Sequence, residues 1–106
     1  MSGLEKIAEY YGFESQKAQC NEEMAELTIA LNKFWRKNLH CGEVKLTPEI
    51  LYRLKKTPEY ENVLEELADV MNMILQIEYL LDMDISKTAD YKLQRELERI
   101  EKQCSN

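Results

Sequence analysis

The sequence contains little glycine or proline, with only 3 Gly and 2 Pro in 106 residues. These two residues supply most tight turns, so a sheet built from many hairpins is excluded. Leu, Glu, Lys, Ala, Met and Gln, which favour helices, are abundant instead. We therefore predict an all-α helical bundle. The length fits one domain, residues 1–106, and is too short for two separate cores.

Histidine and cysteine are also scarce. The three cysteines, Cys20, Cys41 and Cys104, are odd in number and have no CxxC spacing. Neither a disulfide framework nor a zinc ribbon is therefore indicated, and a reduced compartment is expected. A di-iron bundle needs Glu-x-x-His motifs, which the chain lacks because Lys37, and not Glu, stands three residues before its one histidine, His40.

Long hydrophobic runs are missing, and basic residues are in the minority. No apolar stretch approaches the ~20 residues of a membrane span, and the N-terminus MSGLEKIAEY lacks the hydrophobic core of a signal peptide. The 14 Lys and Arg are outnumbered by 20 Asp and Glu, and the net charge of -6 would repel a nucleic-acid backbone. We expect a cytoplasmic protein that binds neither a membrane nor a nucleic-acid polymer.

The first half of the chain carries the signals of two helices. A short helix from Ser2 to Tyr10 is predicted, because Ser2 and Glu5 have the spacing of a capping box. Ser15 is expected to cap a long helix over 16–37, whose apolar residues recur at helical spacing.

The second half carries three more helices. Two Thr-Pro pairs combine a cap with a first-turn proline, and they open a short inserted helix over 48–55 and a long helix over 58–81. The two long helices are expected to pack antiparallel at the centre. Because the part over 70–81 is apolar on more than one side, we expect burial at the bundle centre or in a homo-oligomer interface.

A last helix is predicted over 86–102. Its apolar residues Leu93, Leu97 and Ile100 are expected to face inward. The segment ELERIEK alternates in charge sign, which is typical of a solvated helix face.

Two acidic pairs lie three residues apart, one on each long helix: Glu23 with Glu26, and Glu66 with Asp69. At this spacing side chains are neighbours on one helix face, so antiparallel packing can bring four carboxylates together. No Lys or Arg stands three or four places from Glu23 or Glu26. A divalent cation would offset the repulsion, and oxygen ligands favour Mg²⁺ or Mn²⁺. Alternatively, these acids are polar helix flanks or pair with lysines of another helix.

The segments EEMAEL and EELADV resemble the ExxE and ExxD signature of the all-α nucleoside triphosphate pyrophosphatases. That superfamily includes MazG-like pyrophosphohydrolases, dimeric dUTPases and phosphoribosyl-ATP pyrophosphohydrolase. The likeness extends through YGFESQKAQCNEEMAELTIALNKFWR and ENVLEELADVMNMILQIEYLL to YKLQRELERI, and the short MazG-like proteins are the most similar. The segment between Glu26 and Glu66 is longer than is usual in MazG-like members, because it holds the inserted helix.

The resemblance implies a MazG-like fold and a Mg²⁺-dependent pyrophosphohydrolase. Such an enzyme cleaves the α–β phosphate bond of an NTP or dNTP to give NMP and pyrophosphate, in nucleotide-pool housecleaning. A homodimer or homotetramer is implied as well. The metal ligands carried over by the motif are Glu23, Glu26, Glu66 and Asp69.

Other candidate residues lie near these ligands or carry positive charge. Glu22 and Glu65 stand next to the ligand pairs and are candidate proton acceptors for an attacking water. The candidates for contacts with the triphosphate or sugar are Lys33, Arg36, Asn72, Lys92 and Arg95. For each of these, solvation of a helix face or a packing role is the alternative. For the whole chain, the rival hypothesis is a non-catalytic helical oligomerisation or regulatory module.

Overall fold

The computed structural model describes residues 1–39 and 45–105. Within these ranges the secondary structure is helical, which confirms the all-α prediction. The five helices are α1 (Gly3–Tyr11), α2 (Phe13–Asn38), α3 (Pro48–Leu54), α4 (Pro58–Leu80) and α5 (Ile85–Ser105). None of these helices is both long enough and apolar enough to cross a membrane. The sequence features around His40, Cys41 and Gly42 lie outside the described residues.

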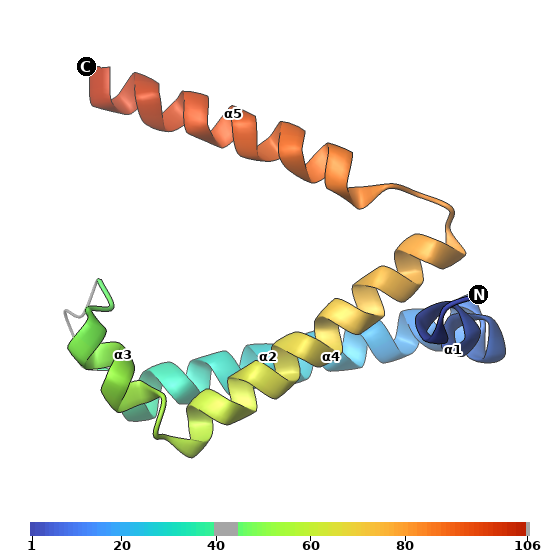
Figure 1. Cartoon of the computed structure of the whole chain (residues 1–106), viewed down its shortest axis with the longest axis horizontal. Coiled ribbons are helices and arrows are strands. Elements are labelled where there is room, and N and C mark those ends of the chain that lie inside the picture. Colours follow the sequence, from blue (N-terminus) through green and yellow to red (C-terminus); the bar gives the residue numbers. More distant parts are fainter. Residues whose placement is uncertain (40–44, 106) are drawn as a thin grey trace.

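The fold is organised around the antiparallel pair α2 and α4, which make the most extensive contact between any two helices (Figure 1). A polar contact joins them near each end. Gln16 Nε2 donates to Gln76 Oε1 at 2.7 Å at one end, and Asn38 Nδ2 donates to Glu59 Oε1 at 2.9 Å at the other. The prediction of two long antiparallel central helices is confirmed.

The predicted capping box of α1 is confirmed. The Ser2 hydroxyl accepts from the Glu5 amide at 3.1 Å, and the Ser2 amide donates to Glu5 Oε1 at 2.8 Å. The backbone hydrogen bond with Ser2, followed by the side-chain one, lowers the pKa of Glu5. Both Thr-Pro signals are also confirmed, since Thr47 and Thr57 cap α3 and α4 and a proline occupies the first turn of each helix.

The predicted cap of α2 is wrong. Helix α2 begins at Phe13, so Ser15 lies inside the first turn and does not cap the helix. The reason is the backbone of Gly12, which takes φ 84° and whose amide donates to the Ala8 carbonyl at 2.8 Å. Glycine adopts this positive φ without steric cost, so one residue both ends α1 and starts α2, and no loop remains for a serine cap.

The core is small and lies between α1, α2 and α4, with one contribution from α3. Helix α1 is also tied to α4 through Tyr79, whose hydroxyl donates to Glu9 Oε1 at 2.7 Å. This bond, with desolvation and the Glu9 charge, raises the pKa of Tyr79 to about 12. The buried apolar side chains are Ala8, Cys20, Ala30, Leu54, Val70 and Met73.

The contact between Gln16 and Gln76 is buried, with each residue 5% exposed. We predict that Gln76→Met destabilises the fold by about 1–3 kcal/mol, because it leaves the buried Gln16 amide without its partner. The double variant Gln16→Met/Gln76→Met should recover most of that loss, because it removes both polar groups. Denaturant unfolding of the wild type, both single variants and the double variant measures the coupling. Additive losses in the double variant would contradict this reading.

Helix α5 departs from the sequence-based expectation. It has no buried residue, and Leu93, Leu97 and Ile100 are 64%, 53% and 48% exposed. Their predicted inward orientation is therefore wrong for the single chain. Figure 1 shows α5 running away from the α2–α4 pair, so that the chain is open and C-shaped.

The turn between α4 and α5 is held by local hydrogen bonds. Glu78 Oε2 accepts from the Ile85 amide at 2.7 Å, and Asp84 Oδ1 accepts from the Ser86 amide at 3.1 Å. Asp82 adopts φ 50°, a left-handed conformation that Asp tolerates better than most residues. These contacts set the direction of α5, none of whose residues is buried.

Candidate metal centre

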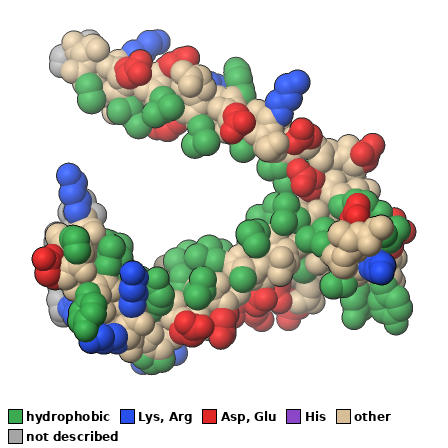
Figure 2. Space-filling model, viewed as in Figure 1, with side chains coloured by type: hydrophobic (Ala, Val, Ile, Leu, Met, Phe, Trp, Pro, Cys, Tyr) green, Lys and Arg blue, Asp and Glu red, His purple; other side chains and the backbone are tan. Residues whose placement is uncertain are grey.

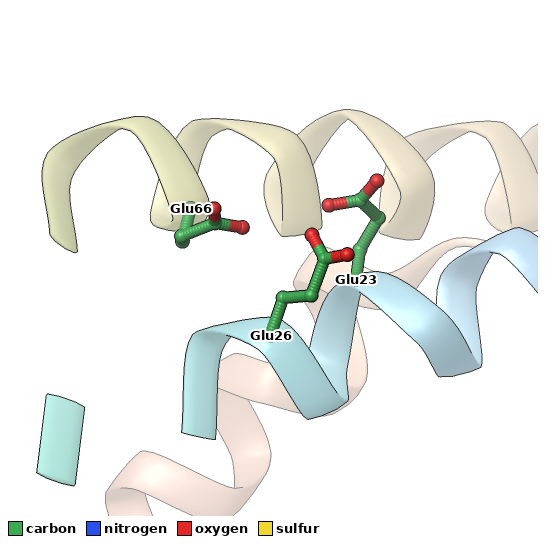
Figure 3. A group of neighbouring side chains, drawn as sticks. All are labelled: Glu23, Glu26 and Glu66. Atoms are coloured by element: carbon green, nitrogen blue, oxygen red, sulfur yellow. The ribbon is translucent and has the colours of Figure 1, made fainter. Parts of the chain in front are cut away.

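Three carboxylates from the two central helices meet at the α2–α4 contact. Glu23 and Glu26 lie three residues apart on α2 and face Glu66 of α4 (Figure 3). One oxygen from each of the three lies within 4.8 Å of the others. The spacing on α2 and the antiparallel packing together bring these charges to one place, as predicted for three of the four acids.

Two oxygens of this carboxylate cluster (Glu23, Glu26 and Glu66) are buried without a hydrogen-bond partner. They are Glu23 Oε2 and Glu66 Oε2. The other oxygen of Glu23 accepts from Gln19 Nε2 at 2.8 Å. Within residues 1–39 and 45–105, none of the three forms an ion pair with Lys or Arg. Burying a carboxylate oxygen without a partner is costly, so a hydrogen-bond donor or a cation at these two oxygens would stabilise the fold.

The pKa of Glu26 reflects the same uncompensated negative charge. The negative charge of Glu23 is the main cause that raises the Glu26 pKa above its ordinary value, followed by desolvation and the charge of Glu66. A bound cation would reverse these effects, because it favours the ionised form of every carboxylate around it.

A pH dependence follows for the metal-free protein. Below the ordinary pKa of 4.5, Glu26 is protonated in the folded and the unfolded chain and contributes nothing. As the pH rises through 4.5, the unfolded chain ionises first, so the folded state loses relative stability until the pH passes the raised pKa of Glu26. We predict that, in chelator, Glu26→Gln gains melting temperature relative to wild type as the pH rises above 4.5. A melting-temperature difference between Glu26→Gln and the wild type that stays constant with pH would contradict charge repulsion at Glu26.

The donor set fits a hard divalent cation. All three groups are carboxylates, and neither histidine nor cysteine belongs to the cluster. Mg²⁺ is usually held by a few carboxylates together with water and substrate phosphates, and Mn²⁺ accepts the same ligands. The buried, unpartnered oxygens of Glu23 and Glu66 are suitable ligand atoms.

The fourth predicted ligand, Asp69, is not part of the cluster. It lies one turn after Glu66 on α4 and its side chain is exposed. Its role as a ligand stays a prediction. The two candidate proton acceptors, Glu22 and Glu65, are exposed and directly precede Glu23 and Glu66 in the sequence, and their roles stay predictions too.

The predicted substrate-binding residues are spread over three helices. Lys33 and Arg36 are exposed near the end of α2. Asn72 of α4 lines a shallow hollow formed with α1 and with Gln76. Lys92 and Arg95 lie on α5, which diverges from the α2–α4 pair (Figure 1). The single chain therefore does not bring these five residues together around the carboxylates.

Sequence reasoning missed two features of this region. Gln19 stands four residues before Glu23, and this helical spacing is the signal that could have identified it as the donor to that carboxylate. The second feature is an apolar hollow between α2, α3 and α4, where the rings of Phe34 and Tyr60 lie 6.3 Å apart. The inserted helix α3 provides one wall of that hollow through Leu51 and Leu54.

No protein-family model, curated protein or solved structure matches the chain. A function is therefore inferred from the chemistry and placement of its own residues. The two features that carry chemical information are the carboxylate cluster and the exposed apolar helix faces.

Proposed function

We propose that the protein is a divalent-cation-dependent nucleotide pyrophosphohydrolase. It would cleave the α–β phosphate bond of an NTP or dNTP and serve nucleotide-pool housecleaning. The main support is that Glu23, Glu26 and Glu66 place their oxygens together with no neutralising Lys or Arg among the described residues. The likeness of EEMAEL and EELADV to the pyrophosphatase signature supports the same activity.

The charge of the chain and of the substrate explains why this activity needs a cation. The chain has a net charge of -6, and a triphosphate is itself a polyanion, so the two repel each other. In the proposed enzyme Glu23, Glu26 and Glu66 hold Mg²⁺, with Asp69 as the predicted fourth ligand. When bound, Mg²⁺ neutralises phosphate oxygens and makes a water more acidic.

The residues of the chain have three tasks in this proposal. Gln19 orients Glu23 through its hydrogen bond of 2.8 Å. The packing of α2 on α4 keeps water away from one oxygen each of Glu23 and Glu66. Glu22 or Glu65, which are exposed and directly precede two of the ligands in the sequence, would accept the proton of the attacking water.

The products of hydrolysis test the proposed reaction. A panel of canonical and modified nucleoside triphosphates is incubated with the protein and Mg²⁺, and the products are separated by ion-exchange chromatography. We expect NMP and pyrophosphate, loss of turnover in EDTA, and recovery with Mg²⁺ or Mn²⁺. Release of NDP and phosphate would mean that a bond other than the α–β bond is cleaved. Absence of turnover with every nucleotide would contradict the proposed function.

The rival function is a helical oligomerisation or regulatory module without catalysis. It is favoured by the exposed apolar residues of α5, which serve no purpose in the proposed chemistry. Such a module predicts no stabilisation of the fold by Mg²⁺ or nucleotide. Thermal melting with both ligands therefore separates the two functions.

A further inference from the structure

The charges of the chain are unevenly distributed along the sequence. Residues 33–56 contain 7 of the 14 Lys and Arg but only 2 of the 20 Asp and Glu, so this segment carries a charge of +5 and the rest of the chain carries -11. The net charge of -6, on which the expectation of no nucleic-acid partner rests, therefore does not describe every part of the chain. The basic residues of the segment are Lys33, Arg36, Lys37, Lys45, Arg53, Lys55 and Lys56.

The fold brings this segment to one end of the molecule. Helix α3 packs against the end of α2 and the start of α4, since Leu51 and Leu54 line the same apolar hollow as Phe34 and Tyr60. Figure 2 shows Lys and Arg side chains gathered over α3 and the adjoining ends of these two helices, with Asp and Glu side chains farther along the pair. We call this part of the surface, formed by residues 33–39 and 45–56, the basic end.

Several positive charges of the basic end lack an acidic partner. All seven basic side chains are exposed, and Arg36, Lys37 and Lys55 form no ion pair with an Asp or Glu of the described residues. Basic residues in the last turn of a helix offset its dipole, which accounts for Arg36 and Lys37 in α2. That effect does not account for Lys45, which precedes the N-terminus of α3, where a positive charge is unfavourable.

Two aromatic side chains are exposed among these charges. Trp35 directly precedes Arg36 and is 61% exposed, and Tyr52 directly precedes Arg53 and is 67% exposed. The Tyr52 ring already holds a cation on one face, with Lys56 Nζ 3.9 Å from the ring centroid. Trp35 stacks on no other ring of the described residues. Exposed rings among basic side chains suit a single-stranded nucleic acid, because rings stack on bases and cations hold phosphates.

We propose that the basic end binds a single-stranded nucleic acid, with Trp35 and Tyr52 stacking on bases and the basic residues holding phosphates. A single strand is favoured over a duplex, because a flexible strand can stay on this end. A rigid duplex would extend along the acidic surface of the rest of the chain, which repels it. This binding goes beyond the proposed hydrolysis, since it needs neither the metal nor the carboxylate cluster.

Fluorescence anisotropy of a labelled oligonucleotide tests the binding. The probes are RNA and DNA strands of about 20 nucleotides, longer than the ~4–16 of a typical binding site. They carry a 5′-hydroxyl end and are measured in EDTA, so neither a metal nor a triphosphate takes part. We expect binding at about 50 mM salt and an affinity about 20–50-fold lower at about 200 mM, as three or four phosphate contacts predict. The strand that binds more tightly identifies the preferred sugar.

Two results of this titration would overturn the proposal. The first is that neither strand binds at the lower salt concentration. The second is that a duplex containing the same DNA strand binds more tightly than either single strand.

Two double variants test whether the contact is local. Arg36→Glu/Lys37→Glu reverses two charges of the basic end and should weaken binding more than about 10-fold. Lys87→Glu/Lys102→Glu makes the same change in net charge at exposed positions of α5 and should weaken binding less than about 3-fold. Equal losses in the two variants would mean that only the overall charge of the protein matters, which contradicts a binding surface at the basic end.

The intrinsic fluorescence of Trp35, the only tryptophan of the chain, tests the stacking. A base stacked on its ring should quench this fluorescence as the oligonucleotide binds, and Trp35→Ala should weaken binding about 10-fold. Tyr91→Ala is the matched control, because Tyr91 is an exposed aromatic residue of α5, and it should bind like the wild type. Unquenched fluorescence together with unchanged binding by Trp35→Ala would refute the stacking. Tighter binding of poly-glutamate than of either strand would assign the basic end to an acidic protein instead.

Discussion

Mg²⁺ at about 100 times its dissociation constant is expected to raise the melting temperature of the wild type by roughly 10–20 °C. The reason is that a ligand at this concentration adds about 2.7 kcal/mol to the folded state, and about 1 kcal/mol shifts the melting temperature of a small domain by several degrees. The unfolded chain does not hold Glu23, Glu26 and Glu66 together, so a cation held by these three side chains would bind only the folded form. Thermal melting followed by circular dichroism measures the shift at one fixed protein concentration.

The matched variants separate site binding from a general salt effect. Glu26→Gln should lose most of the shift, because it removes one of the three clustered carboxylates. Glu101→Gln on α5 has the same chemical change on an exposed helix and should keep the full shift. Equal shifts in the two variants would mean that Mg²⁺ acts on the overall charge of the protein.

Glu66→Gln is expected to reduce pyrophosphate release by more than about 100-fold. Substitutions of residues that merely support a metal ligand cost about 10–100-fold, and Glu66 is a proposed ligand itself. The metal-free variant should be at least as stable as the wild type, because the substitution removes a charge next to Glu23 and Glu26. Initial rates at saturating Mg²⁺, with Glu101→Gln as the control, give the measurement. Near-normal turnover in Glu66→Gln would exclude this residue from the metal site.

The helices and most of their caps could be predicted because their signals are local. The pair Ser2 and Glu5 and the two Thr-Pro pairs specify hydrogen bonds within three residues, and the structure has all of them. The predicted cap at Ser15 is wrong because Gly12, with its positive φ, takes the N-cap position of α2. A positive φ at glycine is allowed but not required, so the sequence does not show at which residue the second helix begins.

The carboxylate cluster was predictable in part. The spacing between Glu23 and Glu26 fixes their shared face, and the absence of nearby Lys or Arg distinguishes them from ordinary surface acids. The rotation of α4 against α2 is set by packing, and it brings Glu66 into the cluster while Asp69 is exposed outside it. The spacing of residues along one helix does not determine how that helix is rotated against its neighbour.

The orientation of α5 could not be predicted for a different reason. An apolar stripe such as Leu93, Leu97 and Ile100 shows that a helix packs against something, but the pattern is the same for its own chain and for a second copy. The direction of α5 depends on the turn hydrogen bonds of Glu78 and Asp84. Sequence periodicity carries no information about that turn.

The most direct measurement is a crystal structure of the protein grown with Mn²⁺ and a non-hydrolysable dNTP, with anomalous diffraction to locate the metal. The proposed function predicts an anomalous peak between Glu23, Glu26 and Glu66, with carboxylate oxygens at about 2.1 Å and the triphosphate on its other side. Peaks located elsewhere, or a nucleotide bound away from these three side chains, would contradict it.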